Sequence, residues 1–331
     1  MKLIKKNKVR ILSLCLLITL LFTGCSIGDR QVYFASKSGM GNVFKIGDFA
    51  CSEDEAKVYL ANYKNLYGKL YGTDLWNEKY DTNQMGESIK DAVISHLTKV
   101  YALNVYAQEN DITLTEAEED GVASAAKKYY DSLNKIERHY TGASQKEIKE
   151  MYHKYALAEK VYVQLMNNVD ENVSEDEARV MDAYVLYVKE EKLAKKLNTK
   201  IKNGATFERL ASTYNEGEST RVTFGRNTYD SAIEDVVFQL DNDEVSDMIQ
   251  TKDGYYFFEC INKYNEKLSE ENKANIVEQR QKQAMDDVIS QVEKEYYSDF
   301  NQKKWDKVEV SDSADVTTNS FFSTLDSFIS Y

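Results

Sequence analysis

Few residues of this chain are of the types that usually carry chemistry in proteins. It has four cysteines and three histidines among 331 residues, the histidines being His96, His139 and His153. No Cys-x-x-Cys pair or Cys/His cluster has the spacing of a zinc site, and no acidic run has the spacing of a calcium loop. We therefore expect neither a metal nor a cofactor. Cys51 and Cys260 could form a disulfide or remain two separate buried thiols, and the sequence leaves both open.

Cys25 is the cysteine whose surroundings indicate a role. A basic head of five Lys and Arg residues precedes an apolar run over 11–22, which ends at Thr23-Gly24-Cys25. This pattern is typical of a secretory signal peptide, and the run is shorter than the about 20 residues that a membrane-spanning helix needs. The phrase LFTGC also resembles the lipobox of bacterial lipoproteins. That resemblance implies cleavage after residue 24 and lipidation of Cys25.

The lipid and the charge of the chain together predict its location and exclude one class of partner. Two acyl chains suffice for stable attachment, so we expect residues 25–41 to tether the protein to the outer face of the bacterial cytoplasmic membrane. The net charge is −13, and removal of 1–24, with five positive and no negative charges, would make it −18. An acidic protein does not bind nucleic acid by counterion release, so we expect no nucleic-acid partner.

Apolar periodicity and helix-capping signals predict a mainly helical region after the tether. A strand is expected over 42–48, followed by helices over 53–70, 85–110, 115–138 and 144–168 and a short helix from 174. Three of these helices begin with a Ser or Thr that has Glu three residues later, as in a capping box. These pairs are Ser52/Glu55, Thr115/Glu118 and Ser144/Glu147.

The C-terminal region is expected to contain one long helix over 269–300 and a short strand over 305–310. Residues 311–331 alternate polar residues with Phe321, Phe322, Leu325, Phe328 and Ile329. Such a segment is either docked on the protein or a loose apolar tail. Docking is favoured because exposed apolar segments are a liability.

Between these regions, residues 183–263 follow an order of strand, two helices, Gly-bearing turn, helix and strands. The phrases AYVLYV, KNGATFERLASTY and EVSDMIQTKDGYYFFE resemble the parvulin-type peptidyl-prolyl isomerases. The preceding helices, with LTKVYALNVYAQENDITLTEAEED, resemble the chaperone domain of SurA-like and PrsA-like foldases. The resemblance implies an α+β fold. A helical chaperone domain (42–180, completed by 265–331) would carry an inserted parvulin-like domain (181–264) with a four-stranded antiparallel sheet and surrounding helices.

The resemblance also implies a set of site residues. Tyr184 and Tyr256 stand where the family has its two catalytic histidines, and the hydroxyl before the last strand is retained as Thr251. The prolyl pocket would be formed by Phe224, Tyr229, Ile233 and Phe238. Because all three histidines of the chain precede residue 183, the histidine dyad is absent. The two tyrosines could instead hydrogen-bond across neighbouring strands and only hold the sheet, and Phe238 could belong to the core.

Three functions remain open from the sequence. The first is a membrane-anchored extracytoplasmic foldase, nominally a peptidyl-prolyl cis-trans isomerase, that assists unfolded or newly exported polypeptides with weak or lost catalysis. The second is a non-catalytic holdase lipoprotein that uses the parvulin fold only for binding or structure, since a fold does not dictate activity. The third is a structural or assembly lipoprotein that binds no client.

Overall fold

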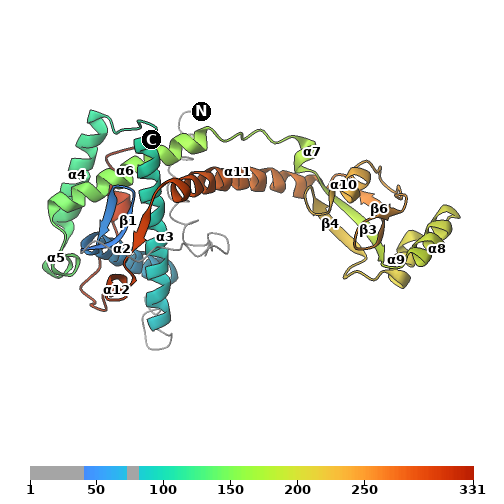
Figure 1. The fold of residues 1–331 in the computed structure, drawn as a ribbon, viewed down its shortest axis with the longest axis horizontal. Coiled ribbons are helices and arrows are strands. Elements are labelled where there is room, and N and C mark those ends of the chain that lie inside the picture. Colours follow the sequence, from blue (N-terminus) through green and yellow to red (C-terminus); the bar gives the residue numbers. More distant parts are fainter. Residues whose placement is uncertain (1–40, 73–81) are drawn as a thin grey trace. The chain divides into compact units, whose positions relative to one another are not determined.

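The computed structural model describes residues 41–72 and 82–331, with side chains from residue 85 in the second range. The predicted signal peptide and Cys25 lie outside the described residues. The chain divides into two compact units, which we describe separately: the first combines 41–168 with 284–331, and the second is 169–283. Figure 1 labels those of their elements for which there is room. Within the described ranges, no helix combines the length and the apolar character that crossing a membrane requires.

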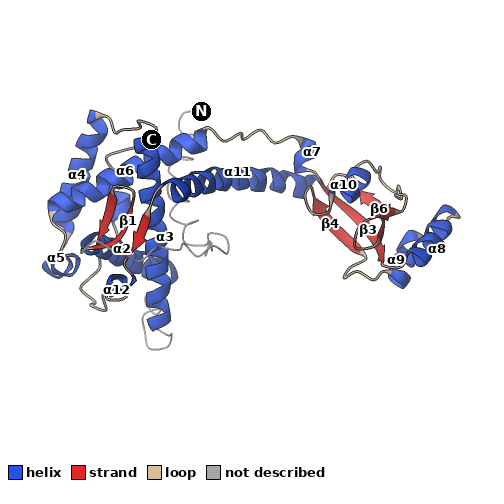
Figure 2. Cartoon of the chain, viewed as in Figure 1, coloured by secondary structure: helices blue, strands red, loops and turns tan. Residues whose placement is uncertain are grey.

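The first unit is mainly helical, as the periodicity predicts (Figure 2). Its helices are α2 (Glu53–Tyr71), α3 (Thr82–Glu109), α4 (Glu116–Ser132), α5 (Lys135–Thr141), α6 (Gln145–Asn167), α12 (Gln302–Trp305) and α13 (Phe321–Leu325). Residues 284–295 of α11 (Glu266–Glu295), a helix that begins in the second unit, also belong to it.

Helix caps set the ends of several of these helices. The reciprocal capping boxes predicted at Thr115/Glu118 and Ser144/Glu147 are confirmed. The single helix predicted over 115–138 is wrong, because Asn134 forms a further capping box with Glu137 and begins α5. A new N-cap needs an extended backbone at the capping residue, and Asn134 has that conformation, with φ −73° and ψ 174°. The chain therefore turns between α4 and α5.

A small antiparallel sheet joins the two ends of the described chain. Its order is β2 (Phe49–Ser52), β1 (Asn42–Ile46), β7 (Ser298–Phe300). The strand expected near residue 42 is confirmed as β1, whereas β7 replaces the predicted end of the long helix. The strand expected over 305–310 is also wrong, since the short helix α12 ends at Trp305 and residues 306–310 form a turn and irregular backbone. Strands that pair across some 250 residues leave little local signal in the sequence.

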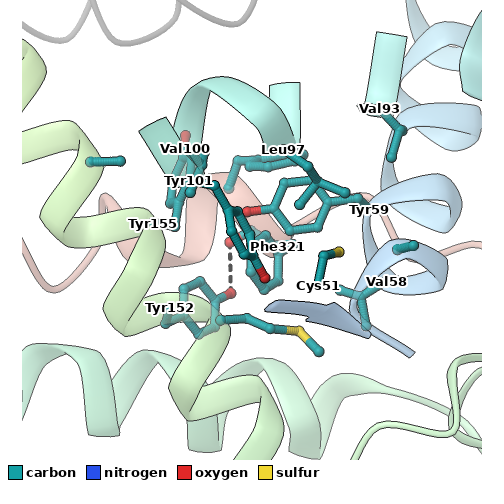
Figure 3. Packing of buried hydrophobic residues seen from close by; sticks show 14 of the residues in the cluster. Cys51, Val58, Tyr59, Val93, Leu97, Val100, Tyr101, Tyr152, Tyr155 and Phe321 are labelled. Carbon is teal, nitrogen blue, oxygen red and sulfur yellow. Dashed lines mark hydrogen bonds between the residues drawn. The ribbon is translucent and has the colours of Figure 1, made fainter. Parts of the chain in front are cut away.

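The core of the first unit is rich in aromatic side chains. Tyr59, Tyr101, Tyr152 and Phe321 are fully buried in one cluster (Figure 3). Docking of the C-terminal segment, the favoured alternative for 311–331, is therefore confirmed. A buried carboxylate contacts this cluster: Glu55 is only 3% exposed and accepts a hydrogen bond from the Tyr101 hydroxyl at 2.8 Å.

Glu55 completes only half of the predicted capping box. Its N–H donates to the side chain of the N-cap residue Ser52, while its carboxylate pairs with the Lys154 ammonium instead of returning to the N-cap backbone. A buried carboxylate without a cation is costly, which explains why Glu55 is directed inward to Lys154.

The second unit is built on a four-stranded antiparallel sheet, as predicted. Its order is β4 (Arg221–Gly225), β3 (Val180–Val188), β6 (Tyr255–Asn262), β5 (Ile249–Gln250). The helices are α7 (Glu175–Ala178), α8 (Glu191–Lys202), α9 (Phe207–Tyr214), α10 (Ser231–Val237) and residues 266–283 of α11. Both central strands carry apolar side chains on two faces, so two separate clusters form, one on each side of the sheet. The expected α+β fold class is confirmed.

Candidate functional site

The two faces of the second-unit sheet differ in what covers them. One face packs on α8 and α9 through Leu186, Val188 and Phe257. The other carries a row of aromatic rings, which we call the aromatic face: Tyr187, Phe224, Tyr229, Tyr256 and Phe258. Since side chains alternate along a strand, Ala183, Val185 and Tyr187 point to the aromatic face and Tyr184 to the opposite one.

The rings of the aromatic face contact one another in sequence. Tyr187 and Tyr256 are register partners on β3 and β6, and their ring centroids are 4.6 Å apart. Tyr256 stacks parallel to Phe258 at 6.3 Å, and Tyr229 meets Phe258 edge to face at 5.5 Å. Tyr187, Tyr229 and Tyr256 are only partly buried. This end of the face therefore offers apolar ring surface edged by phenolic hydroxyls, which suits an apolar ring such as that of proline.

One tight turn positions both tyrosines of the pair. The Tyr187 hydroxyl donates to the carbonyl of Asp253 at 2.5 Å. Gly254 follows with φ +148°, and a Cβ there would lie 2.7 Å from both Tyr187 Cε2 and the Val188 carbonyl oxygen. The Thr251 hydroxyl donates to the Gly254 carbonyl and accepts from the Asp253 N–H, both at 3.2 Å. Thr251 thus closes the turn that carries Tyr256 into the sheet.

The structure does not bring Tyr184 and Tyr256 together. Tyr184 pairs in register with Glu259, three residues along β6 from Tyr256, and lies on the opposite face of the sheet. A side-chain hydrogen bond with Glu208 raises the pKa of Tyr184. The cross-strand tyrosine pair considered from the sequence is therefore not formed by these two residues. The partner of Tyr256 is Tyr187 instead.

The residues expected to form a prolyl pocket lie together, but most of them are buried. Phe224, Ile233 and Phe238 are 5%, 3% and 2% exposed and belong to one cluster with Phe258. Tyr229 alone of the four is partly accessible, with its ring 4.9 Å from that of Phe224. Side chains this deeply buried fill the interior of the unit. Of the expected pocket, the surface of Tyr229 remains available to a ligand.

Phe238 is further immobilised by two arginines. The guanidinium carbons of Arg226 and Arg179 lie 4.0 and 5.0 Å from its ring centroid, and Arg179 also donates to its carbonyl. A cavity of about 410 Å³ opens beside it. Its lining is largely charged and consists of Glu175, Asp176, Arg179, Phe238, Gln239, Leu240, Asp241, Lys263 and Tyr264. A prolyl ring favours apolar walls, so this cavity is a poor match for it.

Burial and nearby carboxylates set the acid–base character of the exposed tyrosines. Burial, followed by the charges of Tyr187, Asp253 and Asp230, raises the pKa of Tyr256. Burial likewise raises the pKa of Tyr229, with a smaller contribution from Tyr256. Both phenols therefore stay protonated at neutral pH and act as hydrogen-bond donors, not as bases.

The histidines lie outside this face, and Cys260 belongs to the buried cluster beneath it. His96 is buried in the first unit, where burial lowers its pKa to about 3 and its Nδ1 shares a 2.6 Å hydrogen bond with Tyr63. His153 pairs with Glu119, and His139 is exposed. Cys51 and Cys260 are both buried and free. Among the described residues, no group of His, Cys, Asp and Glu side chains is arranged to hold a metal ion.

Tyr187 is the site residue that the sequence interpretation did not include. Its signal was present, because Tyr184 and Tyr187 are three residues apart on one strand and must face opposite sides. Side chains along this strand point alternately to its two faces, Leu186 and Val188 to one and Val185 and Tyr187 to the other. This alternation does not by itself show which face is covered by helices. That information comes only from the packing of α8 and α9.

Comparison with known proteins supports the family expected from the sequence. Residues 143–273 match the model of the PPIC-type PPIase domain. The chain is 27% identical to foldase protein PrsA 3 of Bacillus cereus over 139 residues. This aligned region covers 40% of this chain and 48% of the relative. It is 30% identical to foldase protein PrsA 1 of Listeria monocytogenes over 98 residues, and this aligned region covers 28% of this chain and 33% of the relative. The matches thus span about half or less of these relatives.

Solved structures give a weaker likeness over more of the chain. The crystal structure of PrsA from Bacillus cereus is 18% identical, covers 87% of this chain and 99% of that chain, and has a TM-score of 0.37. A SurA-like chaperone from Campylobacter jejuni is 11% identical, covers 79% of this chain and 99% of that chain, and has a TM-score of 0.27. On the sequence matches, the chain is similar to the PrsA foldases, and its residues 143–273 match the PPIC-type PPIase domain.

Proposed function

We propose that this protein is an extracytoplasmic foldase that binds unfolded or newly exported polypeptides and has weak or lost prolyl isomerase activity. The match to the PPIC-type domain supports the class of function. The observation that supports weak catalysis is the composition of the aromatic face. On this face β3 presents Ala183, Val185 and Tyr187, and residues 169–283 contain no histidine that could take part.

Isomerisation of a peptide bond has a barrier of about 18–20 kcal/mol, and an enzyme lowers it by stabilising the twisted amide better than the planar one. Hydrogen-bond donors that are already positioned for the twisted amide usually contribute most to this stabilisation. On the aromatic face the hydroxyls of Tyr187 and Thr251 already donate to backbone carbonyls. Within the described part of the chain, the Tyr256 hydroxyl has no such partner. We propose Tyr256, which stands where the family has a catalytic histidine, as the donor for catalysis, with Tyr184 and Thr251 in structural roles.

An isomerisation assay on Xaa-Pro tetrapeptides tests this assignment. We expect an acceleration far below that of a histidine-containing parvulin measured beside it, and we expect Tyr256→Phe to abolish what remains, because the ring is kept while the donor is lost. Tyr184→Phe is the matched control and should leave the rate unchanged, since Tyr184 faces the other side of the sheet. A residual rate that survives Tyr256→Phe would remove Tyr256 from the mechanism.

We also propose that the protein is lipid-anchored through Cys25 at the outer face of the cytoplasmic membrane, as its lipobox-like phrase suggests. Two acyl chains would suffice for this attachment. A Cys25→Ser variant should then leave the membrane fraction. Retention of that variant in the membrane would count against lipidation at this residue.

The alternative function is a holdase without any catalysis, and one observation favours it. Most residues of the expected prolyl pocket are part of the buried core, so the domain is stable without a ligand in that position. In this alternative the second unit contributes only structure or a binding surface, and Tyr256→Phe changes neither client binding nor refolding rate.

A further inference from the structure

The last part of the chain is held in the first unit in an unusual way. Residues 311–320 form neither helix nor strand, and their backbone is bound by side chains of the surrounding helices. The Asn65 amide donates to the carbonyls of Val316 and Thr318 at 3.0 and 2.9 Å. The Glu137 carboxylate accepts from the N–H groups of Thr317 and Thr318, both at 2.8 Å. Polar side chains thus form hydrogen bonds with the backbone of this segment, as they would with the backbone of a bound peptide.

The same mode of binding continues at the aromatic residue that follows. The Phe321 N–H donates to Asn62 Oδ1 at 3.0 Å, and its carbonyl accepts from the Tyr152 hydroxyl at 2.6 Å, the bond drawn in Figure 3. The Phe321 ring stacks on Tyr152 with centroids 4.3 Å apart and planes 8° apart. Phe322 enters a neighbouring aromatic enclosure, where it stacks on His96 at 5.4 Å. Two adjacent aromatic side chains therefore fill two adjacent apolar sites.

The side chains of Asn62 and Glu137, which bind the segment, are also held by contacts that do not involve it. The Asn62 amide donates to the carbonyl of Val58 at 2.8 Å and to the Tyr129 hydroxyl at 2.7 Å. The other oxygen of Glu137 accepts the N–H of Asn134 in the capping box that begins α5. Asn62 and Glu137 are 0% and 3% exposed. Buried polar groups that lose a partner are costly, so this arrangement favours permanent occupation by some polypeptide backbone.

We infer that these helices form a peptide-binding groove, lined by Asn62, Asn65, Asn134, Glu137 and Tyr152, and that residues 311–331 are its built-in occupant. The groove binds the backbone of an irregular segment and the two neighbouring rings that begin the short helix α13 (Phe321–Leu325). Its exchangeable ligand is a segment of an unfolded polypeptide with adjacent aromatic residues that can form such a helical turn. This ligand class rests on the proposed foldase function. The groove and its occupant lie entirely within the first unit.

The C-terminal segment would act on such clients as a tethered competitor. A segment joined to its own groove by a short linker reaches an effective concentration of about millimolar, so only clients that bind well or are abundant displace it. Its far end is secured separately, because the Tyr331 hydroxyl donates to the Ala156 carbonyl at 2.8 Å and Ile329 packs against Gly121.

A labelled peptide tests the groove in the full chain. The probe is a fluorescein-labelled synthetic copy of residues 315–331, followed by fluorescence anisotropy. We expect the Phe321→Ser chain to bind the probe at least ten-fold more tightly than the wild type, because its own segment no longer competes. Phe328→Ser, a 42% exposed position of the same segment, is the matched control and should leave the affinity at the wild-type level. A probe with serine in place of Phe321 should bind neither chain.

A folded Phe321→Ser chain that binds the probe no better than the wild type would overturn the inference. If that variant does not fold, hydrogen exchange on the wild-type chain decides. The amides of Thr317, Thr318 and Phe321 should exchange at least ten-fold faster than those of Ala156, Leu157 and Ala158 in α6, because an occupant leaves its groove without unfolding it. Equal rates would show that the segment is an inseparable part of the core and would refute exchange. Failure to hold unfolded clients would end the proposed function but would not alter probe binding.

Discussion

At the scale of single residues, the aromatic face depends on a position without a side chain. The Tyr187 ring occupies the space that a Cβ of Gly254 would need, and its hydroxyl bonds the carbonyl of the preceding residue, Asp253. The same turn leads into Tyr255 and Tyr256 on β6. Position 254 therefore couples the turn to the tyrosine pair, and a substitution there must displace either the ring or the backbone of β3.

We predict that Gly254→Ala destabilises the protein by about 2 kcal/mol or more, since it combines a steric clash with a backbone conformation that L-residues avoid. Urea denaturation followed by near-UV circular dichroism, which reports tyrosine packing, measures this change. Gly217→Ala is the control, because its nearest non-neighbour atoms are at an ordinary 3.4 Å. Equal stability of the two variants would show that Tyr187 is not fixed by the turn.

Residue roles were the least predictable part of the site. The sequence places Tyr256 and Thr251 at the correct end of the sheet, because the phrase TKDGYYFF marks a turn followed by a strand. It does not separate Tyr184 from Tyr187 as the partner of Tyr256, since that choice depends on which face α8 and α9 cover. Burial of Phe224, Ile233 and Phe238 is likewise a property of the packed unit.

At the scale of elements, local signals and long-range pairing differ in how well a sequence reveals them. Ser144/Glu147 and Thr115/Glu118 predict two helix starts correctly because each box is completed within four residues. Asn134/Glu137 is the same kind of signal and was hidden inside a continuous apolar period. The strand β7 has no local signal of comparable strength, because its partner β1 lies at the other end of the described chain.

The docked C-terminal element carries a pH dependence in the first unit. Burial, followed by the charge of Asp326 at the end of α13, raises the pKa of Glu159 on α6 to about 8, while a hydrogen bond from Tyr155 lowers it. The folded pKa thus lies above the unfolded value, so the protonated form stabilises the fold. This contribution is complete below about pH 4.5 and is lost as the pH rises through about 8.

We therefore expect the free energy of unfolding of the wild type to fall between pH 6 and pH 9 by about 1–2 kcal/mol through this group, after allowance for its partial exposure. Glu159→Gln should remove this fall and stabilise the protein at pH 9. Urea denaturation at the two pH values provides the measurement. Glu150→Gln, at an exposed position on the same helix, is the control. An unchanged pH dependence in Glu159→Gln would contradict the role of Glu159.

At the scale of the whole molecule, the chain combines a helical unit that encloses its own C-terminal segment with a unit that resembles the PPIC-type domain and whose aromatic face lacks histidine. The α+β fold class and the family were predictable because short phrases such as KNGATFERLASTY and the helix caps are local. The packing of residues 311–331 and of the aromatic face was not predictable, because it depends on contacts between segments far apart in the chain.

The most direct test of the proposed function is the refolding of a secreted protein whose slow phase is limited by prolyl isomerisation. One experiment gives two quantities, the rate constant of the slow phase and the yield of native protein. We predict that stoichiometric amounts of this chain raise the yield while changing the rate constant by less than about two-fold, since binding is retained and the barrier of about 18–20 kcal/mol is barely lowered. A ten-fold faster slow phase at catalytic amounts, with the yield unchanged, would contradict this account.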